Sequence, residues 1–206
     1  MNTTIENEVE VKKPVDYTWI KEVLLKKEIM KALYTCASKE DSRQALAGFF
    51  ILPDRKVFST DGRRLVIIED DQFESLEPGN YEFKSKPEYL KNGLAMVMLG
   101  KNDYQAPNIE MVLKGLDKVK VCSHVFELDK SNKAISLTSF ICKVVTKTGS
   151  GINYDLLDFL PGEVFDATTK EGNIEGAPIM LSGAFGSTKM TAVITIFSVL
   201  LFICFL

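Results

Sequence analysis

The segment that most constrains the fold is residues 38–65, SKEDSRQALAGFFILPDRKVFSTDGRRL, in which two turn signals separate short β-forming stretches. Pro53 and Asp54 suit a tight turn between the first two stretches. Asp61 and Gly62 suit a second turn before the apolar run RLVIIED. Because tight turns join neighbouring strands as hairpins, three antiparallel strands are predicted here.

The same order of elements, a strand, a helix and then several strands, is predicted twice. Residues 19–25 suit a strand or an early helical turn, and residues 26–37 repeat apolar side chains at three- and four-residue spacing, as a helix does. Residues 81–84 suit a short strand, and the SKPE pattern after it has the form of a capping box that opens a helix over residues 86–98. Strands are predicted again from residue 108 onward. The predicted fold class is α+β, with two strand-helix-strands units and antiparallel sheets.

Composition divides the chain into four segments. Residues 1–16 are polar and mixed in charge and suit a flexible arm, and residues 17–162 contain both predicted units. Residues 163–189 are rich in Gly, Thr, Ala and acids and weakly patterned, which indicates a linker or an incomplete element. Residues 190–206, MTAVITIFSVLLFICFL, form an uncharged apolar tail.

The apolar tail has three interpretations. As a helix it would reach about 25 Å, slightly short of a hydrocarbon core of roughly 30 Å, and would serve as a C-terminal membrane anchor. Alternatively, it packs as a helix or strand into a partner or the core, or it is the altered end of a longer reading frame. The N-terminus lacks the basic start and apolar core of a secretory signal, which argues against export. The predicted location is therefore the cytoplasm, at a membrane if residues 190–206 are an anchor.

Charge and the scarcity of reactive side chains disfavour several classes of function. The net charge is -3 and the pI about 5.4, so any contact with nucleic acid must come from a local basic face. His124 is the single histidine, and Cys36, Cys122, Cys142 and Cys204 form no short Cys-x-x-Cys pair. A zinc site, a disulfide scaffold and a nucleophile-histidine-acid triad are therefore disfavoured. The sequence predicts a protein that is not an enzyme and that holds no cofactor or metal.

Two motifs in the first unit occur at compatible spacing: SKEDSRQALAG at residues 38–48 and FSTDGRRL at residues 58–65. Together they resemble a domain of the bacterial sliding clamp family, the beta subunit of DNA polymerase III. In that family a Ser-Lys-acid-acid segment leads to Arg-Pro and then to Leu and Gly, and the next hairpin ends in Thr-Asp-Gly-His-Arg-Leu. Gln44 replaces the usual Pro of the first motif, and Arg63 stands where His is common in the second.

The resemblance covers roughly residues 18–161 and implies a DNA-clamp, or processivity-fold, domain. Residues 81–90 occupy the place of the family's short strand and second helix, and residues 149–161 resemble its closing segment. The implied function is a non-catalytic processivity factor of DNA replication that encircles duplex DNA as a homo-oligomer and tethers a DNA polymerase or clamp loader. Such a ring needs contacts to the DNA backbone but no reading of base sequence. The alternative is a membrane-tethered interaction module of clamp fold with no DNA role.

By the same resemblance, the helices at residues 26–37 and 86–98 would line the hole of the ring. A solvated helix face is the plainer interpretation of lysines on these helices. For Arg43 and Arg64 there is an equal alternative to DNA binding, in which they anchor the turn to acids within the domain. The predicted DNA-binding residues are Lys27, Lys31, Arg43, Arg63, Arg64, Lys86 and Lys91.

Overall fold

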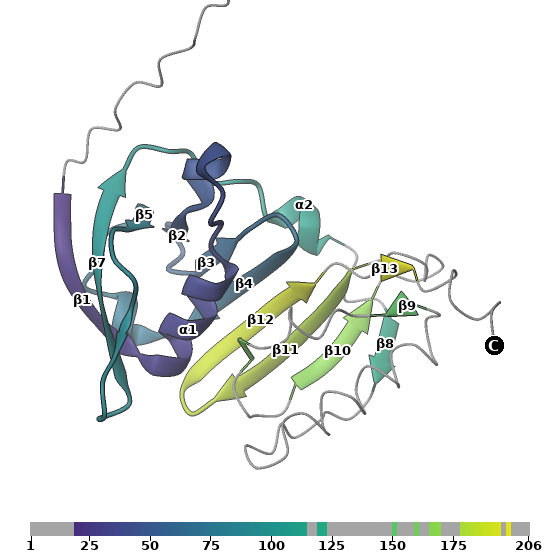
Figure 1. Ribbon diagram of the computed structural model, residues 1–206. Coiled ribbons are helices and arrows are strands. Elements are labelled where there is room, and N and C mark those ends of the chain that lie inside the picture. The colour runs from purple at the N-terminus through teal and green to yellow at the C-terminus, as the bar shows by residue number, and fades with distance from the viewer. Residues whose placement is uncertain are drawn as a thin grey trace, which may run out of the picture.

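The protein is mostly antiparallel sheet with few helices (Figure 1). The computed structural model describes residues 19–114, 119–122, 150–151, 159–160, 165–169, 178–194 and 197–198. The helices are α1 (Lys27–Cys36), α2 (Glu110–Leu113) and the 3-10 helices η1 (Asp41–Leu46) and η2 (Asp71–Phe73). The strands are β1 (Trp19–Lys26), β2 (Gly48–Ile51), β3 (Val57–Thr60), β4 (Arg64–Glu69), β5 (Gly79–Phe83), β6 (Glu88–Tyr89), β7 (Leu94–Asn102), β8 (Val119–Cys122), β9 (Ser150–Gly151), β10 (Phe165–Thr169), β11 (Ile179–Phe185), β12 (Thr188–Ile194) and β13 (Phe197–Ser198).

Eleven of these strands form one sheet in the order β1-β7-β5-β2-β3-β4-β12-β11-β10-β8, with β6 added beside β7. Strands β9 and β13 form a separate pair. The pairing of β4 with β12 joins the first half of the chain to the second, with Arg64 opposite Ile194 and Glu69 opposite Lys189. Figure 1 shows the result, in which the yellow strands β12 and β11 continue the sheet beyond the blue β4.

Helix α1 begins directly after β1 and packs on the sheet through one apolar face (Figure 1). Burying each larger side chain of this face contributes roughly 1.5–3 kcal/mol. The helix ends where Ala37 takes an extended conformation. The helix predicted over residues 26–37 is confirmed. Its buried side chains are Ile29, Met30, Ala32, Leu33 and Cys36.

The three strands predicted from residues 38–65 and the run after them are confirmed as β2, β3 and β4. The turn between β2 and β3 is closed by the Leu52 N–H, which donates to the Lys56 carbonyl at 2.9 Å. Asp54 accepts from the Lys56 N–H at 3.2 Å, as expected of an Asp in a tight turn. Arg55 takes the positive φ of 70° that this turn requires.

The helix predicted over residues 86–98 is wrong, because this segment is the β6–β7 hairpin. Asn92 and Gly93 form its turn, in which Gly93 has a φ of +80° that is unfavourable within a right-handed helix. Burial along β7 alternates, with Ala95 and Val97 inside, so the period is that of a strand. Without the second helix, the two predicted strand-helix-strands units are not present in that form. Residues 110–113, predicted as part of a strand, instead form helix α2.

Residues 163–189, expected to form a linker or an incomplete element, contain β10, β11 and the start of β12. Gly186, with a φ of +56°, turns the chain between β11 and β12. Small residues such as Ser, Gly and Thr gave no periodic signal, yet the backbone hydrogen bonds of the sheet do not depend on side-chain identity.

The first residues of the apolar tail belong to the sheet. Met190, Ala192 and Ile194 on β12 point into the core, opposite residues of β4. Phe197 and Ser198 form β13, and the rest of residues 190–206 lies outside the described residues. Within the described parts of the chain, no helix has the length and apolar content needed to cross a membrane.

A polar network ties the end of β1 to the residue after β4 and to the β11–β12 turn. Lys26 Nζ donates to Asp70 Oδ2 at 2.8 Å, to Thr188 Oγ1 at 3.2 Å and to Ser187 Oγ at 3.3 Å. Asp70 also accepts from the Thr188 hydroxyl and from the Gln72 N–H, and its side chain is only 2% exposed. Burial by itself raises the pKa of Asp70, but the hydrogen bonds from Lys26, Thr188 and Gln72 outweigh it and hold the pKa below its usual value.

We expect Asp70→Asn to lower the free energy of unfolding by about 1–3 kcal/mol, because it removes the charged acceptor of a largely buried pair. Urea denaturation at neutral pH measures this loss. Asp54→Asn is the control, since Asp54 and Lys56 form an exposed pair, with side chains 52% and 45% exposed, and such pairs contribute about 0–1 kcal/mol. A loss at Asp70 no larger than the loss at Asp54 would contradict the role of this network.

The same substitution should change the pH dependence of stability. Because the folded-state pKa of Asp70 is lowered, its contribution is present above the ordinary carboxyl pKa of about 3.9 and is lost as the pH falls below it. The wild-type chain should therefore lose more stability than Asp70→Asn between about pH 5 and about pH 2. Parallel pH curves for the two proteins would exclude this contribution.

Candidate functional site

The turn between β3 and β4 is organised by the carboxylate of Asp61. Its Oδ1 accepts from the N–H groups of Arg63 and Arg64 at 2.8 and 2.9 Å, and its Oδ2 accepts from Arg64 Nε at 2.9 Å. Thr60 Oγ1 accepts from the Gly62 N–H at 3.1 Å and donates to the Arg64 carbonyl at 2.8 Å. Gly62 has a φ of +85°, which is why the turn needs glycine at this position. We call residues 60–64 the Asp61 loop.

Arg43 connects the first sequence motif to this loop. Its Nη1 donates to the Asp61 carbonyl at 2.7 Å, while its Nε lies 3.2 Å from a Glu40 carboxylate oxygen. The two motifs at residues 38–48 and 58–65 therefore form one structural unit. Of the two interpretations left open for Arg43 and Arg64, anchoring of the turn within the domain is the one that these contacts support.

A cavity of about 300 Å³ opens beside the Asp61 loop. Arg63 and Arg64 line it on the loop side, and side chains from α2 and β12 line it elsewhere. On α2, Val112 lines the cavity and is 46% exposed, and Met111 beside it in the chain is 76% exposed. The sequence did not reveal this cavity, because its walls come from segments far apart in the chain. Its apolar wall includes Leu46, Leu65, Ile109, Val112 and Val193.

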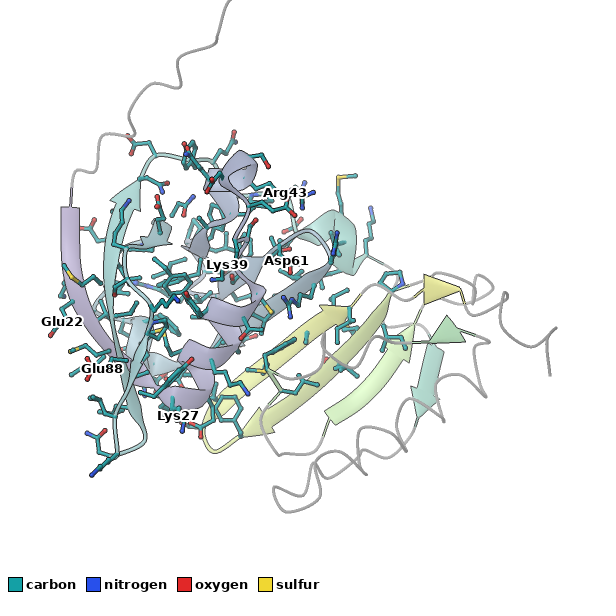
Figure 2. All side chains as sticks on the ribbon, viewed as in Figure 1. Glu22, Lys27, Lys39, Arg43, Asp61 and Glu88 are labelled. Carbon is teal, nitrogen blue, oxygen red and sulfur yellow. The ribbon has the colours of Figure 1, made fainter. Side chains whose placement is uncertain are left out.

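Lys27 and Lys91 lie at the end of α1 that faces the β6–β7 hairpin. The Lys27 N–H donates to the Gly93 carbonyl at 2.9 Å, and its ammonium lies 5.7 Å from the centroid of the Tyr89 ring. Lys91 is exposed in the turn between β6 and β7. Figure 2 shows Glu88 on the same side of the molecule as Lys27, so this surface carries mixed charge. Lys31, one helical turn further along α1, is half-buried.

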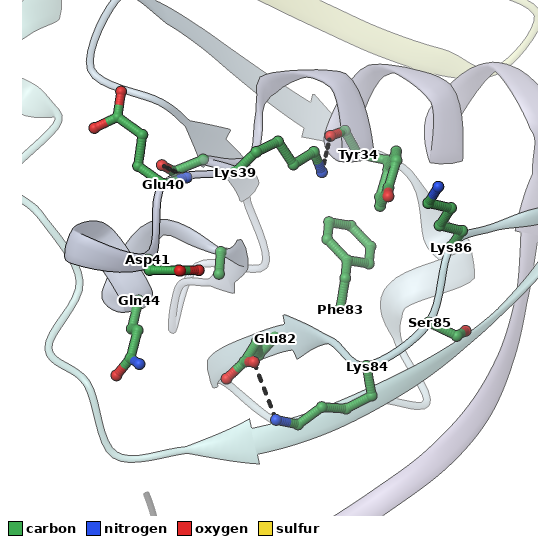
Figure 3. Close-up of a pocket in the computed structure, with 12 residues that line it drawn as sticks. Tyr34, Lys39, Glu40, Asp41, Gln44, Glu82, Phe83, Lys84, Ser85 and Lys86 are labelled. Atoms are coloured by element: carbon green, nitrogen blue, oxygen red, sulfur yellow. Dashed lines mark hydrogen bonds and ion pairs between the residues drawn. The ribbon is translucent and has the colours of Figure 1, made fainter. Parts of the chain in front are cut away.

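Lys86 lies apart from that surface, in a cavity of about 370 Å³ between α1, η1 and the end of β5 (Figure 3). Lys39 lies in the same cavity, and its Nζ donates to the Tyr34 carbonyl at 2.9 Å. Opposite, Lys84 Nζ pairs with Glu82 Oε1 at 3.0 Å. The predicted set is thus divided among the Asp61 loop, the start of α1 and this second cavity. His124 lies outside the described residues.

Comparisons with known proteins add little to this geometry. No family model matches the chain, and no curated protein matches it. Among solved structures, the chain is similar to the crystal structure of a DnaN sliding clamp (DNA polymerase III subunit beta) from Bartonella birtlesii bound to griselimycin. The identity is 14% and the TM-score 0.43, over 93% of this chain and 69% of that chain. At this score the similarity carries no weight for family or function.

Replacement of Gly62 tests the link between Arg43 and the Asp61 loop. A Cβ at Gly62 would lie 3.0 Å from Arg43 Nη1, whereas at Gly93, whose φ of +80° is nearly the same, no atom lies within 4 Å. Both Gly→Ala variants should lose about 1–2 kcal/mol of unfolding free energy from backbone strain. Gly62→Ala should lose more, and a double-mutant cycle with Arg43→Ala should give a coupling energy of at least about 0.5 kcal/mol. Additive losses would show that Arg43 and the loop are energetically independent.

Proposed function

We propose that the chain is a subunit of a non-catalytic, sliding-clamp-like processivity factor. Copies of it would encircle duplex DNA and tether a DNA polymerase or clamp loader. The observation that carries the proposal is the contact between the two clamp-like motifs. Arg43 in the first motif donates a hydrogen bond to the carbonyl of Asp61 in the second. Residues that resemble a family at two separate places in the chain are therefore also neighbours in space, as a shared domain requires.

Ring formation would use the two ends of the large sheet. Strand β1 pairs with β7 on one side, strand β8 pairs with β10 on one side, and within the described residues neither has a second partner. Free strand edges present unpaired N–H and C=O groups that can add another strand. Pairing β1 of one copy with β8 of the next would be a head-to-tail contact, which generates a closed ring when the rotation per copy fits.

Contact with DNA would come from exposed lysines rather than from the arginines of the Asp61 loop. Lys27 and Lys91 are exposed and near each other, and Lys86 is exposed on the segment before β6. Backbone contacts of this kind supply affinity without base specificity. Arg43 and Arg64 are already engaged within the chain, so their removal is expected to act on stability first.

The tethered partner would dock in the cavity beside the Asp61 loop. This cavity has an apolar wall and exposed apolar neighbours on α2, a combination suited to an apolar peptide segment. Arg63, which is exposed at its edge, would supply a polar contact at the rim.

The topological part of the proposal predicts salt-sensitive retention of the full chain on circular duplex DNA and its loss when that DNA is linearised, since a ring slides off free ends. Sedimentation of the DNA with bound protein measures retention. Light scattering of the same sample should give an oligomeric mass, because a monomer cannot encircle DNA. Equal retention on circular and linear DNA, or a monomeric mass, would refute encirclement.

The contact part predicts that Lys27→Glu and Lys91→Glu each weaken binding for all DNA sequences alike. Each should make the negative slope of log affinity against log salt shallower by about 1, because one phosphate contact is lost. Lys114→Glu is the matched control, because Lys114 is an exposed lysine just after α2 and carries the same change in charge. An equal loss in the Lys114 variant would mean that net charge, rather than this surface, governs binding.

A further inference from the structure

The turn of the β6–β7 hairpin contains the only Asn-Gly pair in the sequence, Asn92-Gly93. Both residues are exposed, and a Cβ placed at Gly93 would have no atom within 4 Å, so this peptide bond is open to solvent. Asn92 Oδ1 accepts from the Leu94 N–H at 3.2 Å, as Asn does in an Asx turn. The Leu90 N–H donates to the Leu94 carbonyl at 2.8 Å and closes the turn.

This turn also supports the start of helix α1. Lys27, labelled in Figure 2, is the first residue of the helix, and its N–H donates to the Gly93 carbonyl at 2.9 Å. The first N–H groups of a helix have no acceptor within the helix, and Lys26 at the N-cap makes no side-chain capping bond. The Gly93 carbonyl therefore caps α1, and a change in the backbone of the turn acts directly on the helix.

The Asp61-Gly62 turn is the comparison within the same chain, because Gly62 and Gly93 have nearly the same φ, +85° and +80°. The Gly62 N–H donates to Thr60 Oγ1 at 3.1 Å, and both carboxylate oxygens of Asp61 accept hydrogen bonds. For the Gly93 N–H, by contrast, no acceptor is found among the described residues. The Gly93 nitrogen is therefore open to deprotonation by solvent, and the neutral carboxamide beside it is a better electrophile than a carboxylate.

We propose that Asn92 is a modification site, which converts without an enzyme to aspartate or isoaspartate through a succinimide. The Gly93 nitrogen loses its proton to hydroxide and attacks the side-chain carbonyl carbon of Asn92, forming an N–C bond. The bond from that carbon to Nδ2 breaks, and ammonia leaves with the electron pair and a proton from water. Water then opens the ring at either carbonyl, so water is the one co-reactant and nothing is oxidised or reduced.

The hydrogen bond from Leu94 favours this reaction in two ways. An Asx turn keeps the carboxamide of Asn92 beside the peptide group that follows it, as a positioned reactant. The Leu94 N–H also donates to Oδ1, the oxygen on which negative charge develops when the nitrogen attacks. Glycine at position 93 adds no Cβ to hinder the attacking nitrogen.

The two products change the start of α1 differently. Isoaspartate adds a carbon to the backbone of the turn, so the bond from the Lys27 N–H to the Gly93 carbonyl is lost. Aspartate keeps the backbone but places a negative charge next to Lys91 in the chain and close to Lys27, where it offsets their positive charge. Only the effect on DNA contacts rests on the proposed function, which assigns these two lysines to DNA.

The test incubates the full chain and follows the peptide that contains Asn92 by mass spectrometry, with the two products separated by chromatography. The rate should rise about tenfold per pH unit between about pH 7 and about pH 9, because the deprotonated nitrogen is the nucleophile. The rate in the folded chain should equal or exceed the rate in urea. Asn108, which is exposed and followed by Ile109, is the internal control and should react at least about tenfold more slowly. A slower reaction in the folded chain than in urea, or equal rates at Asn92 and Asn108, would overturn the proposal.

Asn92→Gln is the matched variant, because its side chain keeps the amide but would have to close a larger ring that forms more slowly. Its peptide should stay unconverted over the period in which the wild-type peptide reacts. Hydrogen exchange at the Lys27 N–H should become several-fold faster in chains that carry isoaspartate and stay unchanged in aged Asn92→Gln. Isoaspartate without faster exchange would refute the capping of α1 by this turn. Neither readout involves DNA, so a failure of the proposed clamp function leaves both unaffected.

Discussion

The pairing of β4 with β12 is the constraint on which the rest of the structure depends. It joins strands more than a hundred residues apart in the chain into one sheet, from Arg64 opposite Ile194 to Glu69 opposite Lys189. At one end of this pairing, Asp70 is enclosed by Lys26 and Thr188. At the other end, the Asp61 loop meets β12 and α2 and encloses the apolar cavity. Separation of these two strands would therefore remove both features together.

The Asp61 loop illustrates how one carboxylate determines what nearby arginines can do. Asp61 accepts from two backbone N–H groups and from Arg64, and its carbonyl accepts from Arg43. Charge-assisted hydrogen bonds of this kind fix the direction of the two guanidinium groups toward the Asp61 loop. Lys27, Lys91 and Lys86 are exposed, and for this reason the proposed DNA contacts are assigned to them.

The predictions from sequence succeeded where turn chemistry and periodicity were strong and local. Asp61-Gly62 marked a turn that the structure contains, and the apolar repeat after Lys26 marked helix α1. The prediction failed at residues 86–98, because Leu90, Leu94 and Val97 fit a helical spacing while the Asn92-Gly93 turn makes this segment a hairpin. Residues 163–189 gave no clear period, and strand β11 within them is positioned by its pairing with β10 on one side and β12 on the other. Neither cavity was predicted, because each is built from segments distant in sequence.

The amino-acid sequence by itself determined part of the local structure: helix α1 with one apolar face, the strands β2, β3 and β4, and the turns that join these strands. These follow from side-chain spacing and from the φ values that Gly permits, which are properties of a few adjacent residues. The tertiary structure alone decided that Arg43 reaches Asp61, that Lys39 lies over Tyr34, and that β12 extends the sheet at β4. Those contacts depend on strand pairing across long loops, whose free energy comes from burial and hydrogen bonds that no local pattern encodes.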